Sequence, residues 1–185
     1  MKKIAIFLAN GFEEIEALTP KDVMSRAGFK CDFVSISDDF KVTSTHGVQV
    51  VAEKKLKDIC DINEYDMIIL PGGMPGAKYL AQSETVIEIV RRFNEQGKYI
   101  GAICAAPALV FSKAGIAKGR RVTSYPGMDE YLKDSIYAEE AVVQDENLIS
   151  SRGPATALQF SYKLVEVLGE NPQGISDGML YNYYQ

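Results

Sequence analysis

Short runs of consecutive apolar residues, each followed by a glycine or proline turn, constrain the fold of this chain more than any other feature. Residues 3–9 and 67–70 are almost unbroken apolar runs, which is typical of strands buried on both faces of a sheet. Helix-length segments lie between such runs; residues 84–96, for example, have helical apolar spacing and end at Gly97. Alternating strands and helices predict an α/β fold with a mainly parallel sheet and helices on both faces.

The other elements follow from similar signals. A helix is expected to begin near Phe12 and to end at Ala27–Gly28, with an interruption where Thr19 would cap a second helix that starts at Pro20. The tyrosine-rich tail, residues 175–185, gives no clear prediction. The remaining expected elements are strands at 29–36, 99–103 and 122–124, an antiparallel excursion over 42–52, short helices at 56–59 and 128–133, a helix from 105 to about 113, a hairpin over 141–150 and a long helix over 155–168.

The size and charge of the chain limit its organisation and partners. A length of 185 residues fits one domain, and we expect residues 1–185 to form it. The net charge is −5 and no cluster of lysine and arginine stands out, so nucleic acid is not an expected partner. No apolar run has the roughly 20 residues of a membrane span, and the first eight residues are expected to be a strand, not a signal peptide. Three cysteines without regular spacing favour a reducing, cytoplasmic location.

Residues 99–110 contain the most suggestive chemistry. They are expected to form a buried strand, a tight turn at Cys104 and a helix from Ala105, and the residues around the turn are small. This arrangement is the cysteine counterpart of a nucleophile elbow, in which the reactive atom points out beyond the sheet. The N-terminus of the following helix would favour the thiolate. A buried structural cysteine remains the alternative, and Cys31 and Cys60 are expected to be packing residues.

Glu16 is the first candidate for a partner of this cysteine. It shares one face of the predicted helix with Phe12 and with apolar residues further along, and a buried carboxylate is costly unless it is paired. Burial should raise its pKa, so that a protonated Glu16 could donate a hydrogen bond to the Cys104 thiolate and lower the pKa of the cysteine. The alternative is an acid that turns to solvent, and Glu13 and Glu14 are explained by the helix dipole alone.

Two glycines and one histidine complete the list drawn from the residues themselves. Gly72 and Gly73 follow a buried strand, and their backbone N–H groups, with that of Ala105, could bind an oxyanion. His46 is the only histidine and lies in a predicted turn, where a surface role is the simpler interpretation. The cysteines and this histidine lack the spacing of a zinc site, so we expect no metal and no cofactor.

Four motifs, taken in order, carry a resemblance to a known family. They are Gly-Phe-Glu-Glu-Ile-Glu at 11–16, Leu-Pro-Gly-Gly at 70–73, Ala-Ile-Cys-Ala-Ala-Pro at 102–107 and Ser-Arg-Gly-Pro at 151–154. Together they resemble the ThiJ/PfpI superfamily, closest to the branch of the Parkinson-disease protein deglycase (DJ-one-like), over nearly the whole chain. The resemblance implies a flavodoxin-like sandwich, similar to class I glutamine amidotransferases, and a homodimer.

The resemblance also implies roles for individual residues. Cys104 would be the reactive, oxidisable cysteine, and Glu16 its protonated partner. Gly73 and Ala105 match the backbone oxyanion positions, and Arg26 matches an arginine placed near the partner subunit's site. Further candidates for contact with a substrate, or for support of these groups, are Tyr125, Gly72, Arg26 and His46.

One departure from the family pattern bears on mechanism. Relatives with Thr-x-His-Pro near residues 123–126 carry a histidine close to the cysteine, whereas this sequence has Tyr125. Tyrosine is a poor base at neutral pH. The resemblance therefore does not extend to a Cys–His protease mechanism, and Glu16 is the proton carrier that remains.

The leading hypothesis is a cofactor-independent glyoxalase or deglycase that acts on reactive carbonyls, such as methylglyoxal or glycated groups, through Cys104 and Glu16. The alternative is a redox-sensing stress-response protein or chaperone that uses oxidation of Cys104. A small-molecule binder with a vestigial site is the third possibility. The sequence cannot separate the first two, because the same surroundings of the cysteine serve both.

Overall fold

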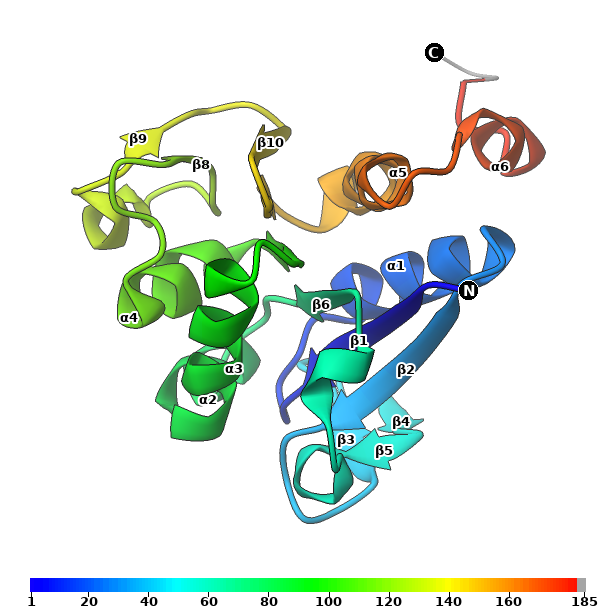
Figure 1. The fold of residues 1–185 in the computed structure, drawn as a ribbon, viewed down its shortest axis with the longest axis horizontal. Coiled ribbons are helices and arrows are strands. Elements are labelled where there is room, and N and C mark those ends of the chain that lie inside the picture. The colour runs from blue at the N-terminus through cyan, green and yellow to red at the C-terminus, as the bar shows by residue number, and fades with distance from the viewer. Residues whose placement is uncertain (183–185) are drawn as a thin grey trace.

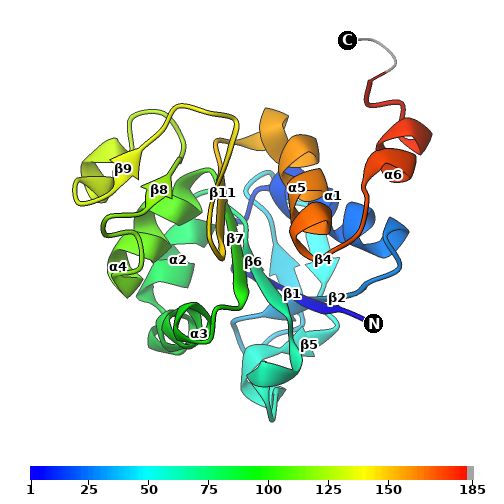
Figure 2. The same ribbon diagram turned by 45° about the horizontal axis from the view of Figure 1, so that its top comes forward.

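A seven-stranded sheet runs through the protein, and the computed structural model describes residues 1–182 (Figures 1 and 2). The strand order is β10-β11-β7-β6-β1-β2-β5. Every neighbouring pair is parallel except β10 and β11, which form an antiparallel hairpin. The mainly parallel α/β fold predicted from the sequence is therefore confirmed. The strands are β1 (Lys3–Leu8), β2 (Lys30–Ser35), β5 (Lys54–Lys55), β6 (Met67–Leu70), β7 (Tyr99–Ile103), β10 (Val142–Asp145) and β11 (Leu148–Ser151).

Helices cover both faces of this sheet, as expected (Figure 2). Two buried apolar clusters lie on opposite sides of the strands, one under α1 and α5 and the other under α2, α3 and the segment after β7. No helix within residues 1–182 combines the length and apolarity that crossing a membrane requires. The helices are α1 (Glu14–Arg26), α2 (Gly76–Gln82), α3 (Glu84–Glu95), α4 (Ser112–Ala114), α5 (Ala157–Val167) and α6 (Gln173–Gly178), and the small two-stranded sheets are β3 (Lys41–Thr43) with β4 (Gln49–Val51) and β8 (Arg121–Val122) with β9 (Ile136–Tyr137).

Helix α1 differs from its prediction in the middle. It runs without a break through Pro20, so the expected interruption and second cap at Thr19 are wrong. Proline in a helix interior costs about 3 kcal/mol, but Pro20 is buried and α1 packs against α5 and β2, so tertiary packing outweighs this local cost. The predicted end is confirmed, because Gly28 adopts a φ of +76° just after the last turn.

Other differences are small. Helix α2 was not anticipated, because it is short and begins at a glycine without a side-chain cap. The segment expected as a helix at 128–133 is a 3-10 turn, and the strand expected at 122–124 is reduced to β8. The helix after Cys104 widens into a π turn over Pro107–Phe111. Part of the tyrosine-rich tail lies in α6, and residues 183–185 fall outside the described residues.

The loops that follow β1, β6 and β7 meet at one edge of the sheet. The Glu13 N–H donates to the Gly72 carbonyl at 3.0 Å, and the Gly76 N–H donates to the Gly11 carbonyl at 3.2 Å. A Cβ on Gly11 would lie 2.4 Å from Pro75 Cδ, so only glycine allows the first two loops to approach this closely. The carboxyl ends of neighbouring parallel strands thus form the site, as expected for such a sheet.

Candidate active site

Cys104 occupies the sharp turn between β7 and the following helical segment. Its φ of +64° is rare for a residue with a side chain, and such strain is a feature of nucleophile elbows. The surrounding backbone holds the turn from two sides: the Cys104 N–H donates to the Ser151 carbonyl at 2.9 Å, and the Tyr125 N–H donates to the Cys104 carbonyl at 2.8 Å. The cysteine is partly exposed. The predicted elbow is therefore present.

Glu16 faces this cysteine across Gly72. The side chain of Glu16 is fully buried, and its Oε2 accepts the Gly72 N–H at 2.8 Å. Its Oε1 is buried without a hydrogen-bond partner among the described polar groups, so it is free to share a proton with the sulfur. A Cβ on Gly72 would lie 2.6 Å from both Cys104 Cβ and Glu16 Oε2, and 3.0 Å from Cys104 Sγ. The expectation that Glu16 points inward is confirmed.

The protonation of this pair corrects one expectation. Burial, with a smaller contribution from the negative charge of Glu13, raises the pKa of Glu16 to about 7, as expected in direction. Burial and the charge of an ionised Glu16 also raise the pKa of the Cys104 thiol to about 12. The predicted lowering of the Cys104 pKa is wrong, because burial of the sulfur has the largest effect and the sequence could not show that depth. Protonation of Glu16 removes that repulsion, so the two groups titrate as one coupled pair.

Two backbone N–H groups face the sulfur. Those of Gly73 and Ala105 hydrogen-bond to it and oppose the rise in the pKa of Cys104. Gly73 adopts a φ of +85°, and a Cβ there would lie 2.4 Å from the Glu13 nitrogen, so glycine is required. The N–H groups of Gly73 and Ala105 are two of the three predicted for an oxyanion site, and both face Cys104. The prediction for the third is wrong, because the Gly72 N–H donates to Glu16 Oε2 at 2.8 Å.

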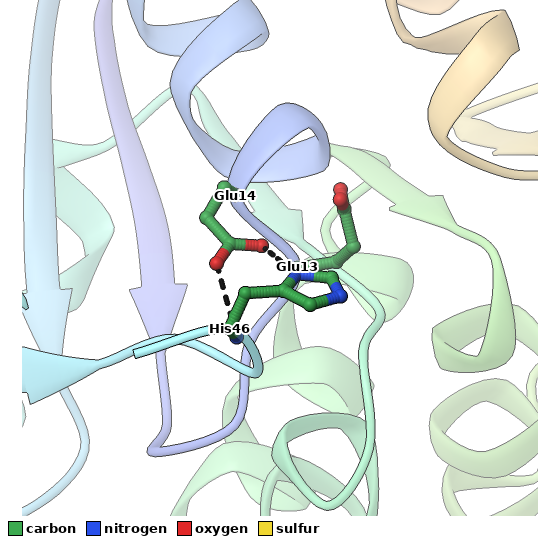
Figure 3. Close-up of side chains that lie close together, drawn as sticks. All are labelled: Glu13, Glu14 and His46. Carbon is green, nitrogen blue, oxygen red and sulfur yellow. Dashed lines mark hydrogen bonds and ion pairs between the residues drawn. The ribbon is translucent and has the colours of Figure 1, made fainter. Parts of the chain in front are cut away.

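The start of α1 and the loop between β3 and β4 bring Glu13, Glu14 and His46 close together (Figure 3). His46 Nδ1 lies 2.8 Å from Glu14 Oε2, and the His46 backbone N–H donates to Glu14 Oε1 at 3.1 Å. Against the cost of burial, hydrogen bonds from Ser44 and His46 lower the pKa of Glu14 to about 2. The hydrogen bond that His46 donates to Glu14, together with the charge of Glu14, raises the pKa of His46. His46 therefore fastens the loop between β3 and β4 to the start of α1.

These three side chains are also the group within residues 1–182 that could share a metal ion. Their ligand atoms lie within 4.8 Å of one another. However, Glu14 is already hydrogen-bonded to His46, and the Glu13 carboxylate accepts the Glu16 N–H at 2.8 Å. The cluster is thus satisfied by its own hydrogen bonds.

Tyr125 and Arg26 lie differently from the other candidates. The backbone of Tyr125 contacts Cys104, but its side chain is about half exposed and its ring lies beside Gly153. Arg26 is on α1 about 15 Å beyond Glu16 along the helix axis, and it pairs with Asp22 at 2.8 Å. Arg26 is therefore not part of the site within this chain, and its proposed place near a partner subunit's site stays a prediction.

Two contributors were missed by the sequence analysis. Ser151 fixes the Cys104 backbone from the neighbouring strand β11, a contact that depends on strand order and has no local signal. Glu13 caps α1 and contacts the loop that holds Gly72. Its position three residues before Glu16 is a capping pattern that could have indicated this role.

Comparisons with known proteins agree with the overall fold. Residues 2–167 match the profile of the DJ-1/PfpI family. The chain is 38% identical over 173 residues to "Protein DJ-1 homolog B" of Arabidopsis thaliana, of which it spans 39% while 94% of this chain is covered. It is 34% identical over 175 residues to "Glutathione-independent glyoxalase DJ-1" of Schizosaccharomyces pombe, with 90% of this chain and 91% of that protein covered. The solved structure "Toxoplasma gondii DJ-1, oxidized" superposes with a TM-score of 0.92 at 33% identity, over 97% of this chain and 98% of that one.

Proposed function

We propose that this chain, which belongs to the DJ-1/PfpI family, is a glyoxalase that acts on small 2-oxoaldehydes such as methylglyoxal without a cofactor. One observation carries the proposal. Cys104 Sγ and the Glu16 carboxyl lie on either side of Gly72, so close that a single Cβ there would contact both. A nucleophile and a proton carrier are therefore close neighbours in the site. The relative from Schizosaccharomyces pombe is named as a glyoxalase, which supports the proposal.

The first step is addition of sulfur to the aldehyde. The Cys104 thiolate attacks the aldehyde carbon, a C–S bond forms, and the carbonyl oxygen becomes an oxyanion. The N–H groups of Gly73 and Ala105, which converge beside the sulfur, would stabilise that charge. Protonated Glu16 is neutral and so does not repel the thiolate. It then donates its proton to the oxyanion, which gives a hemithioacetal.

The second step moves hydrogen between carbons. Glu16, now a carboxylate, removes the proton from the sulfur-bearing carbon, and the resulting enediol is protonated at the neighbouring carbon. The product is a 2-hydroxyacyl thioester of Cys104, which water hydrolyses to a 2-hydroxy acid with release of the thiol. Methylglyoxal and water give lactate with no net oxidation. A Glu16 pKa of about 7 suits a group that both donates and accepts a proton near neutral pH.

The test is turnover of methylglyoxal in the absence of glutathione. The purified protein should form lactate, Cys104→Ser should form none, and Glu16→Gln should lose at least about 100-fold in kcat because it cannot exchange the proton. Cys31→Ser is the matched control, since Cys31 is buried at β2, away from this site. Equal lactate production by the wild type and Cys104→Ser would end the proposal. Release of methylglyoxal adducts from modified protein, measured with the same variants, tests deglycase activity.

A redox sensor is the second candidate, and the partial exposure of Cys104 supports it. A protonated Glu16 could donate a hydrogen bond to an oxygen of a sulfinic acid formed on Cys104. Mild peroxide followed by mass spectrometry separates the candidates. Rapid, stable addition of two oxygens to Cys104 in a protein that does not turn over methylglyoxal favours the sensor, whereas turnover favours the enzyme.

A further inference from the structure

Glu13 lies immediately behind the proposed pair and is almost fully buried, with 9% of its surface exposed. It is the N-cap of α1, and its Oε2 accepts the backbone N–H of Glu16 at 2.8 Å. None of the ion pairs found among residues 1–182 includes Glu13. A buried carboxylate without a cation is costly, and its place beside a catalytic acid calls for a role.

The backbone of Glu13 fixes the loop on which the site depends. Its N–H donates to the Gly72 carbonyl at 3.0 Å, while the Gly72 N–H donates to Glu16 Oε2 at 2.8 Å. Gly73 packs directly against the Glu13 backbone, since a Cβ on Gly73 would lie 2.4 Å from the Glu13 nitrogen. Glu13 therefore holds both the turn of helix that carries Glu16 and the peptide to which Glu16 is bonded.

The charge of Glu13 acts on Glu16 in the same direction. The negative charge of Glu13 disfavours ionisation of Glu16, because like charges repel at short range. The other groups that face Glu16 are the Cys104 thiol from the end of β7 and the Gly72 N–H from the loop after β6. On the other side of Glu13, His46 pairs with Glu14 at 2.8 Å, and its ring also lies within 4.8 Å of the Glu13 carboxylate. Glu13 itself is in none of the ion pairs within residues 1–182, so its charge lies next to Glu16 without a paired cation.

We propose that Glu13 is a positioning residue: its carboxylate holds Glu16 against Gly72 and Cys104, and its negative charge retains the proton that Glu16 passes to the substrate. This inference rests on the function proposed for Cys104 and Glu16. It extends that function by assigning the protonation of the catalytic acid to a second carboxylate that touches neither the sulfur nor the substrate.

The test is the pH dependence of Cys104 alkylation by iodoacetamide. Cys60 is exposed, so the expectation that it packs in the core is wrong, and it would also react. Cys104 modification is therefore followed by peptide mass spectrometry in a Cys60→Ser background. Glu13→Gln keeps a hydrogen-bond acceptor at the cap but removes the charge. Without that charge, Glu16 loses its proton at lower pH and its carboxylate then opposes formation of the Cys104 thiolate. The alkylation midpoint should therefore move about one pH unit higher than that of the wild type. Glu84→Gln is the matched control: it removes one charge from an exposed first turn of α3 and should leave the midpoint unchanged.

A second pair of variants covers the case in which Glu13→Gln does not fold. Glu13→Asp and Glu13→Asn are both good N-caps of equal size and differ only in charge. The Asn variant should have a midpoint about one pH unit above that of the Asp variant, and equal midpoints would overturn the inference. Alkylation needs no turnover, so the two proposals fail separately. A wild type that does not convert methylglyoxal ends only the proposed function, and an active wild type with equal midpoints in the variants ends only this inference.

Discussion

A single methyl group at Gly72 should disable the site while leaving the fold in place. In Gly72→Ala, the new Cβ would lie 2.6 Å from Cys104 Cβ and 2.6 Å from Glu16 Oε2, both far inside van der Waals contact. Neither neighbour can easily move, since Cys104 is on a strained turn held by Ser151 and Tyr125 and Glu16 is fully buried. The side chains must therefore separate, or the loop after β6 must shift.

The expected loss of stability in Gly72→Ala is that of an overpacked core. An extra methyl group in a well-packed site costs about 1–3 kcal/mol. For a chain of this size each kcal/mol lowers Tm by roughly 2–4 °C, so Gly72→Ala should melt about 2–12 °C below the wild type. A displacement of ~1 Å between reacting groups lowers catalytic rates by about 100-fold. Lactate formation should therefore fall far more steeply than stability.

Thermal melting, Cys104 alkylation and lactate formation are measured on the same preparations. Gly153→Ala is the matched control, because Gly153 has an extended backbone with a φ of 171° and its added Cβ would lie 3.5 Å from the Tyr125 ring, an ordinary contact. That variant should behave like the wild type in all three measurements. If Gly72→Ala also melts, alkylates and turns over like the wild type, then Cys104 and Glu16 are not packed as described and the reasoning fails.

Three further predictions concern the groups around the site. Because the pKa of Glu16 is raised from 4.5 to about 7, the folded state binds a proton that the unfolded state releases between these two pH values. The free energy of unfolding should therefore fall by about 3 kcal/mol as pH rises from 4.5 through 7. Urea titrations of Glu16→Gln should lack that fall. Glu14→Gln weakens the bonds to Ser44 and His46, and hydrogen exchange should accelerate over residues 44–48 while Tm shifts by less than about 3 °C; unchanged exchange there would contradict the role given to Glu14. Leu18→Glu places a charge on an apolar groove of α1 in which Leu18 is 40% exposed, and it should convert an expected dimer to the 20.4 kDa monomer in sedimentation; a monomeric wild type would refute the expected interface.

The order of elements could be predicted from the sequence because each strand is a run of apolar residues bounded by strong turn signals. The location of the site could also be predicted, because its three loops all follow buried strands and the carboxyl ends of parallel strands lie at one edge of the sheet. The break predicted at Pro20 failed because local propensity was weighed without the packing of α1 on its neighbours. The contact of Ser151 with Cys104 could not be predicted, because nothing local places β11 next to β7.

The protonation of the pair was predicted only in part. The direction of the Glu16 pKa shift was predicted correctly, because the helical spacing of apolar residues shows which face of α1 is buried. The direction of the Cys104 pKa shift was harder to predict, because it depends on whether burial or the facing N–H groups have the larger effect. That comparison needs the depth of Sγ and the distance to Glu16, and both are properties of the assembled loops.

The two outermost strands of the sheet also determine how copies of this protein can associate. At one end, β5 is only Lys54 and Lys55, and Lys54 is held by Glu64 at 3.3 Å. At the other end, β10 packs against β8, and the backbone N–H of Arg121 donates to Asp145 at 2.8 Å. Both edges, the short strand with two lysines and the strand covered by β8, discourage a neighbouring chain from extending the sheet, which protects the protein from fibrous aggregation. We therefore expect any self-association to use the helical surfaces.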